Sequence, residues 1–253
     1  PGDFMVIQVH YHFEIDAPGS VRRLETRVLV HHSSGWQGYT YRWNDAQSDA
    51  ELLDGNRELR EQITVLGPSG PEPLTWVYPS RADCHGCHTV AAGEILGVRT
   101  HQLNRDFAFP LAIDNQLRTW NHIGLFTADI GSHPAHPALA DPGVRQSALA
   151  ARARSYLAVN CAPCHRPGGP TPVAMDLRFT TDPSSMQAVG VPASSSVVAP
   201  GTPRITPGSA TASELWQRMV RRDGSAMPPL GSTTIDSAGA DLIQAWIEAG
   251  ASR

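Results

Sequence analysis

The sequence predicts an α+β protein, with a β-rich N-terminal domain followed by two mainly helical segments. Three observations support this fold class. Apolar and polar residues alternate through much of the first 80 positions, the pattern Cys-x-x-Cys-His occurs twice in the rest of the chain, and helical patterns flank its second copy. We therefore expect a β-rich domain at 1–79, a first Cys-x-x-Cys-His segment at 80–140 and a helical domain at 141–253.

The composition is that of a folded protein with long loops. The 253 residues are 41% hydrophobic and include 22 glycines and 21 prolines. A net charge of -4 gives no basic surface for nucleic acid or for an anionic membrane. No run of about 18 apolar residues is present, so we expect no membrane span.

The N-terminal domain is built from short runs rich in β-branched and aromatic residues, separated by Gly- and Pro-rich breaks. The expected strands are residues 4–15, 24–30, 39–43, 61–66 and 74–78.

Helices are expected later in the chain. One covers 114–124, where Asp114 can cap the start and Gly124 can end the helix. Its inward-facing residues would be Leu117, Trp120 and Ile123. The Pro- and Gly-rich stretch 129–143 is expected to be a linker or surface loop.

Two further helices are expected at 146–159, running into Cys161, and at 236–249. We expect the first and last helices of this domain to pack together. The expected contacts between them are Tyr156, Leu157, Leu242, Trp246 and Ile247.

The two motifs are Cys84-His85-Gly86-Cys87-His88 and Cys161-Ala162-Pro163-Cys164-His165, and they contain all four cysteines. This spacing lets two thiols bond the two vinyl groups of one porphyrin while the adjacent histidine becomes the proximal iron ligand. Chance predicts far fewer than one such motif in this composition. Structural zinc, two disulfides or a dithiol redox site are the alternatives, but zinc sites usually place their Cys-x-x-Cys pairs much closer together and need neither following histidine. The sequence thus predicts two covalently bound haem c groups, held through Cys84, Cys87, Cys161 and Cys164, with His88 and His165 on the irons.

The second iron also needs a distal ligand. Met227, followed by two prolines and then the last helix, stands where a class I cytochrome c presents its distal methionine, a soft ligand that raises the reduction potential. Met219 is the competing residue, but Leu215, Trp216 and Met219 at helical spacing are typical of a core face.

The first iron has no methionine between its motif and the second one. His101 and His122 are the nearest candidate ligands, and His10 or His12 could reach it from a strand of the β-rich domain. His133 and His136 lie in the Pro-rich loop and are expected to be solvated. The other possibilities are Met5, Met175, Met186, an open site or a ligand from another chain. A histidine pair would give this haem a lower potential than a His/Met pair.

Several segments resemble a family of bacterial dihaem c-type cytochromes of the kind found in Shewanella. They include residues 35–45, the segment 79–88 around the first motif, 97–104, 156–169 around the second motif, and Met227-Pro228-Pro229. The resemblance covers nearly the whole chain and implies a β-rich N-terminal part fused to a dihaem unit, the second half resembling class I cytochromes c. The family pattern requires no histidine at position 101, which counts against that residue as a ligand.

The leading hypothesis for function is single-electron transfer between redox protein partners. Whether the chain is also an enzyme is uncertain; a dihaem peroxidase-like catalyst with an open first iron is the alternative, although no acid/base group supports it. A third hypothesis is a subunit of a haem chain, assembled with copies of itself or another protein through the β-rich domain. Because bacteria attach haem c outside the cytoplasm and Pro1-Gly2-Asp3 does not begin a signal peptide, we expect a periplasmic or extracellular protein whose leader has been removed.

Overall fold

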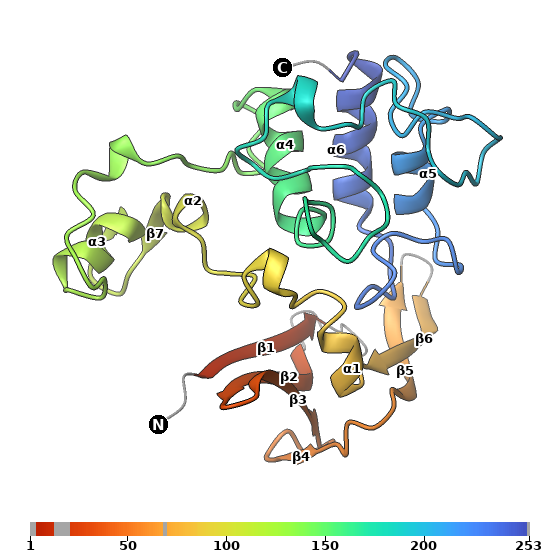
Figure 1. The fold of residues 1–253 in the computed structure, drawn as a ribbon. Coiled ribbons are helices and arrows are strands. Elements are labelled where there is room, and N and C mark those ends of the chain that lie inside the picture. The colour runs from red at the N-terminus through yellow and green to blue at the C-terminus, as the bar shows by residue number, and fades with distance from the viewer. Residues whose placement is uncertain (1–3, 13–20, 68–69, 252–253) are drawn as a thin grey trace. The chain divides into compact units, whose positions relative to one another are not determined.

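The computed structural model describes residues 4–12, 21–67 and 70–251 and shows a mixed α+β protein with small antiparallel sheets and short helices (Figure 1). The chain forms two compact units. Unit 1 consists of Pro1–Val90 and Arg222–Ile235, and unit 2 consists of Ala91–Arg221 and Asp236–Arg253. The stretch Arg222–Ile235, which lies in the C-terminal part of the sequence, therefore groups with the β-rich part. The division into 1–79, 80–140 and 141–253 stays a prediction.

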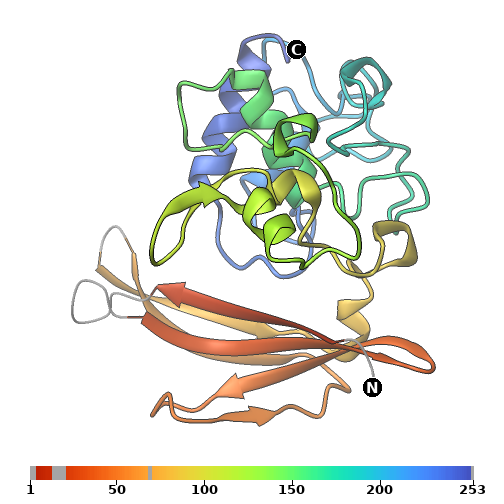
Figure 2. The same ribbon diagram turned by 90° about the vertical axis from the view of Figure 1, so that its left-hand side faces the viewer.

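Unit 1 contains two antiparallel sheets. The larger has four strands that are neighbours in chain order, and its long strands lie side by side in Figure 2: β1 (Phe4–His12), β2 (Val21–His32), β3 (Gly35–Trp43) and β4 (Ala50–Leu52). The smaller is a hairpin of β5 (Leu59–Gly67) and β6 (Gly70–Tyr78), followed by α1 (Arg81–Cys84). The expected strands lie within these, apart from residues 13–15, which are outside the described residues.

The two sheets share a small core, because each strand directs alternate side chains to one face. Leu24 of β2 packs there with Ile63, Trp76 and Tyr78 of the hairpin, and all four are buried. The β-rich character predicted for the N-terminal part is confirmed.

The regular elements of unit 2 are short helices, one hairpin and 3₁₀ turns at His133–Ala135 and Pro183–Ser185; a further 3₁₀ turn, Val90–Ala92, lies where the two units divide the chain. Its elements are α2 (Thr100–Leu103), β7 (Asp106–Ala108), β8 (Ile113–Asn115), α3 (Gln116–His122), α4 (Leu149–Asn160), α5 (Glu214–Met219) and α6 (Ser237–Glu248).

Helix α3 begins slightly later than the sequence predicts. Asn115 rather than Asp114 caps it, by accepting a hydrogen bond from the Arg118 N–H at 3.1 Å. Gly124, at φ +72°, follows its end as expected. Leu117 is buried, but the expectation that Ile123 faces inward is wrong: it is 61% exposed because the helix has already ended before it.

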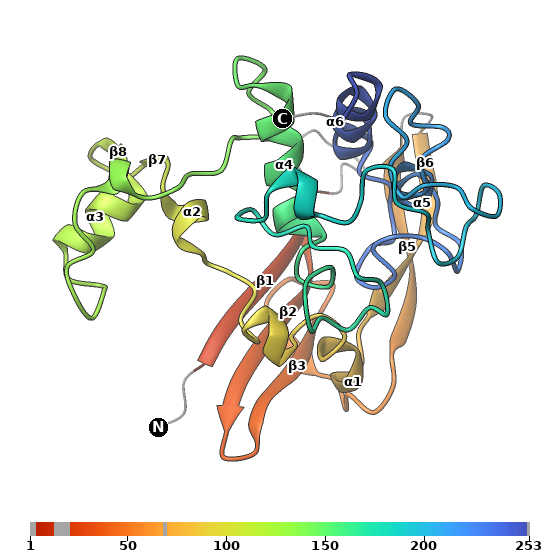
Figure 3. The ribbon, with the colours of Figure 1, turned by 45° about the horizontal axis from the view of Figure 1, so that its top comes forward.

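Helices α4 and α6 pack against each other, as Figure 3 also shows, and the expected core residues Leu157, Leu242, Trp246 and Ile247 are all buried. The contact is close: a Cβ at Gly239 would overlap the Tyr156 ring. Tyr156 also donates a hydrogen bond at 2.9 Å to Asp236, the residue that caps α6.

The 129–143 segment is hydrogen-bonded to Asn104, the residue that follows α2, so it is more than a solvated linker. The Asn104 side chain donates hydrogen bonds to the carbonyls of His133 and His136, at 2.9 and 2.8 Å. The His136 ring lies 2.8 Å from the Ile130 carbonyl oxygen. Both histidines are half-buried, which differs from the solvated positions expected for them.

Candidate functional site

The first Cys-x-x-Cys-His motif begins at the last residue of α1. A reciprocal cap starts this helix, with Ser80 Oγ accepting from the Asp83 N–H and the Asp83 carboxylate accepting from the Ser80 N–H. The helical turn continues through the motif, because the N–H groups of Cys87 and His88 both donate to the Cys84 carbonyl, at 3.2 and 2.9 Å. Residues three and four positions apart lie on the same side of such a turn, so both thiols and the imidazole share a face.

The second motif has the same backbone arrangement at the end of α4. Cys161 closes the helix by donating its N–H to the Leu157 carbonyl at 2.9 Å. The N–H groups of Cys164 and His165 then both donate to the Cys161 carbonyl, again at 3.2 and 2.9 Å. Each motif thus presents two thiols and one imidazole from a single turn.

In unit 1 the Cys84 side chain lies directly against the sheet. A Cβ placed on Gly38 of β3 would lie 2.9 Å from Cys84 Cβ, closer than real Cβ atoms come, and 3.8 Å from Leu29 of β2. Burial raises the pKa of the Cys84 thiol, and the nearby Arg27 only partly opposes this. The glycine is therefore what allows the motif to pack on the strand.

The loop of residues 222–235, which carries Met227, also packs on the first motif. A Cβ on Gly86 would lie 3.0 Å from Leu230 Cδ1. Met227 itself is half-buried in unit 1, whereas His165, whose iron it is expected to bind, belongs to unit 2. The expected pairing of these two residues stays a prediction.

His165, the histidine of the second motif, has a buried ring nitrogen. Its Nδ1 is buried and has no hydrogen-bond partner among the described residues. Burial lowers the pKa of this imidazole, and Arg204 adds to the effect, so the neutral ring is favoured. A buried unsatisfied nitrogen is costly. A neutral imidazole held in this way fits an iron ligand.

The chemistry of Cys161 also fits covalent attachment. Its side chain packs on the core of unit 2, and burial raises the pKa of the thiol to about 12. Zinc sites and dithiol redox sites both use thiolates, which such burial disfavours. A thioether carries no charge, so it can remain in this environment. The residues of the second motif therefore fit haem c.

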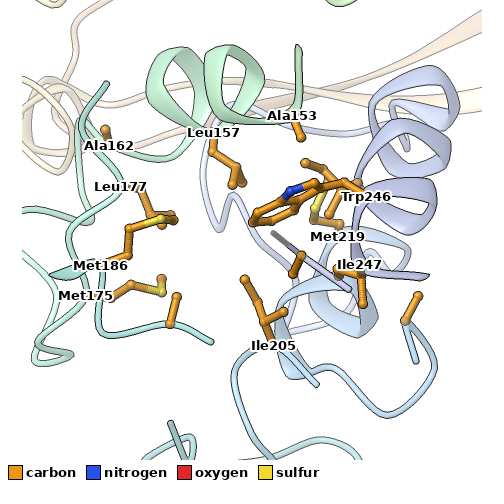
Figure 4. Packing of buried hydrophobic residues seen from close by; sticks show 14 residues of the cluster. Ala153, Leu157, Ala162, Met175, Leu177, Met186, Ile205, Met219, Trp246 and Ile247 are labelled. Carbon is orange, nitrogen blue, oxygen red and sulfur yellow. The ribbon is translucent and has the colours of Figure 1, made fainter. Parts of the chain in front are cut away.

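Several methionines share a core with the second motif. The side chains of Met175 and Met186 point into the same interior as Trp246 (Figure 4). Met186 is fully buried, and its sulfur accepts a hydrogen bond from the Arg154 guanidinium. Met219 is 8% exposed in this core, which confirms its expected place on a core face.

The candidate histidines for the first iron differ in their surroundings. His101 on α2 is half-buried and stacks on Phe179, with ring centroids 5.4 Å apart. Burial lowers its pKa, and Arg99 lowers it further. His122, at the end of α3, is exposed. The side chains of His10 and His12 are outside the described ones.

His101 also lines a cavity of about 180 Å³ within unit 2. The cavity lies between the segment leading into α2, the loop 178–180, and Ala162 and Pro163 of the second motif. It is smaller than the roughly 300 to 1,000 Å³ of sites that hold drug-sized ligands, so it is too small for a whole haem.

Two residues important to these sites were missed in the sequence. Gly38 carries a recognisable signal, because a glycine inside a strand often marks close approach of another group. Arg166, which directly follows the second motif and lines the cavity, carries none. In the part of the chain that the structure describes, no three His, Cys, Asp or Glu side chains gather as a metal-ion site, and no helix could span a membrane.

Searches of protein-family models, curated proteins and solved structures give no match to this chain.

Proposed function

We propose that the chain is a dihaem c-type cytochrome that transfers single electrons between redox partners. The observation that carries the proposal is the shared turn of the two motifs, in which one carbonyl, of Cys84 or Cys161, accepts both following N–H groups. This turn brings to one face the two thiols and one imidazole that a covalently bound haem requires.

Each residue of the motifs then has a defined role. Cys84 and Cys87, and likewise Cys161 and Cys164, would form the thioether bonds that fix each haem. His88 and His165 would be the proximal iron ligands. When bound, each haem supplies an iron that accepts and releases one electron, at a potential set by its ligands and burial. The protein residues contribute attachment, orientation and exclusion of water.

The distal ligands are proposed to differ. Met227 is proposed for the second iron and a histidine, such as His101, for the first, which would place the first haem at lower potential. Met186 is the alternative within unit 2, because it shares a core with the second motif.

A spectroscopic comparison separates the two methionines. Met227→Leu is expected to abolish the iron–sulfur charge-transfer absorption of the oxidised protein, and Met186→Leu to keep it. The reverse result would assign Met186. His101→Ala and His122→Ala identify the first ligand, because only loss of the true ligand converts that haem to a high-spin form.

The proposal includes the cellular setting. Haem c is attached outside the bacterial cytoplasm, so the protein would work in the periplasm or extracellularly. Its partners would be redox proteins, with assembly through the β-rich domain as a further possibility. Peroxide or cyanide binding by the oxidised protein would instead favour the peroxidase-like alternative.

The deciding experiment is a haem count. Intact mass and a pyridine haemochrome assay are expected to show two covalent haems in the wild type. The pairs Cys84→Ala/Cys87→Ala and Cys161→Ala/Cys164→Ala should each retain one haem, and each serves as the control for the other. A wild-type chain that carries no covalent haem when produced with a haem-attachment system would overturn the proposal.

A further inference from the structure

The cavity beside the second motif is rich in guanidinium groups. Arg99, Arg166 and Arg178 all line it, and none of the lining residues, all of which the structure describes, is acidic. Arginine side chains stay protonated at any physiological pH. The cavity therefore collects permanent positive charge.

These guanidiniums are held in place by the backbone. Arg166 donates from Nε to the Ala162 carbonyl at 2.7 Å and from Nη1 to the Ala91 carbonyl at 2.9 Å. Arg99 donates from Nη2 to the carbonyls of Ala92 and Ile95. Backbone carbonyls carry no net charge, so these bonds fix the cations without neutralising them.

Only one of the three arginines has a carboxylate partner. Arg178 forms two-pronged hydrogen bonds with Asp176, and this lowers the pKa of Asp176 to about 2. The carboxylate is thus ionised and offsets one charge. Arg99 and Arg166 form no ion pair within the described residues.

The uncompensated cations lie close enough to affect each other. Arg99 and Arg166 line the same cavity, so their like charges repel each other. Arg166 Nη2 and Arg99 Nη1 make no hydrogen bond to described residues, so both remain able to donate. An oxyanion in the cavity would offset this repulsion and supply an acceptor for these donors.

The loop that completes the cavity is anchored to α4. Arg154 donates to the carbonyls of Arg178, Phe179 and Thr181. This fixes the wall formed by Arg178 and by the Phe179 ring, on which His101 stacks. The cavity is therefore formed by anchored side chains.

We propose that this arginine cavity binds a small oxyanion of the phosphate or carboxylate class beside the second motif. Its volume of about 180 Å³ equals roughly six water molecules, which suits one such group and is too small for a nucleotide. Guanidinium groups favour these ligands because their fork geometry matches two oxygens. The ligand can be a free anion or a propionate of the haem bound at Cys161 and Cys164; only the second source rests on the proposed function.

The test begins with inorganic phosphate titrated into the purified dihaem protein at low ionic strength, followed by calorimetry. A free-anion site predicts saturable binding at one site, weakened at least tenfold in Arg166→Gln and Arg99→Gln. Arg145→Gln is the matched control: it removes the same charge from an exposed position of unit 2 that does not line the cavity. Circular dichroism checks that the variants fold. Arg178→Gln changes an exposed side chain of the cavity lining and is a second test of the same expected loss of phosphate binding.

The propionate source gives a different result in the same proteins. Wild type would then bind no phosphate, while the cavity variants, but not Arg145→Gln, would shift the propionate vibration in resonance Raman spectra. Absence of both phosphate binding and a cavity-specific propionate shift would overturn the inference. Haem content is measured separately, so a chain that binds phosphate without haem would contradict the proposed function and leave this inference standing.

Discussion

The two Cys-x-x-Cys-His motifs have the same backbone turn but different surroundings. In unit 1 the first motif follows a one-turn helix and its Cys84 packs on Gly38 of a β-sheet. In unit 2 the second motif extends from the 12-residue α4, which packs on α6. The turn thus provides attachment geometry, and the elements around it determine how deeply each site is buried. If both motifs hold haem as proposed, the two haems should differ for this reason.

The depth of burial separates the two first cysteines. Burial raises the pKa of Cys161 to about 12, while for Cys84 burial also raises the pKa but Arg27 opposes it. Deeper burial disfavours the oxidised iron, because that state carries the additional positive charge. If the second motif holds a haem with the proposed methionine ligand, both features favour a higher potential there.

The largest expected effect comes from Trp246→Ala in the core of unit 2. Trp246 is 2% exposed, and removing a buried tryptophan costs about 3–5 kcal/mol of unfolding free energy. Denaturant unfolding can be followed by the absorption change of each proposed haem as its iron loses its protein ligands. The second haem should change at a lower denaturant concentration than in the wild type, and the first should change little. Asp241→Ala, exposed on the same helix, is the control and should change stability by less than about 0.5 kcal/mol. Equal loss of both haem signals would show that the two units unfold together.

A selective effect on the first site is expected from Gly38→Ala. The new Cβ would clash with Cys84, and relief of such overpacking costs about 1–3 kcal/mol. The expected result is reduced haem attachment at the first motif, measured by mass, with the second haem retained. Gly224→Ala is the matched control in unit 1, because a Cβ there meets nothing within 4 Å. If both variants attach haem equally, the motif does not depend on this contact.

Regular patterns made much of the fold predictable. Period-2 runs located the strands, and Asp236 with its following apolar face located α6 closely. Ile123 was misplaced because α3 ends at His122, so the helical spacing that buries Leu117 does not extend to it. The start of α3 was one residue out because Asn115 and Asp114 are adjacent, and only the structure shows which one accepts the N–H bond.

The site was less predictable than the fold. Each motif is local, so five consecutive residues are enough to indicate its chemistry. The grouping of 222–235 with unit 1 and the meeting of Arg99, Arg166 and Arg178 involve residues far apart in sequence, and no periodic pattern encodes them. The distal iron ligands also depend on residues far apart in the sequence, so the sequence does not identify them.

The smallest expected effect compares two buried glutamates, one in each unit. Glu25 is fully buried and paired with Arg27, but its Oε2 has no partner among the described residues; burial raises its pKa. Burial also acts to raise the pKa of Glu214, yet hydrogen bonds from Ser196, Val197 and Arg218 outweigh it and the pKa is lowered. The two groups should therefore respond to acid in opposite directions.

The sign of each response follows from its pKa shift. Glu214 contributes stability above the ordinary glutamate pKa of 4.5, and this contribution is lost as the pH falls through its lowered value. Glu25 favours the folded state when protonated, so its contribution is lost as the pH rises through its raised value. At neutral pH, Glu214→Gln should cost about 1–3 kcal/mol, whereas Glu25→Gln should change stability by less than about 1 kcal/mol. Denaturant unfolding of both variants at several pH values tests this, and a Glu25→Gln cost as large as that of Glu214→Gln would mean that the Arg27 pair is a net stabilising contact.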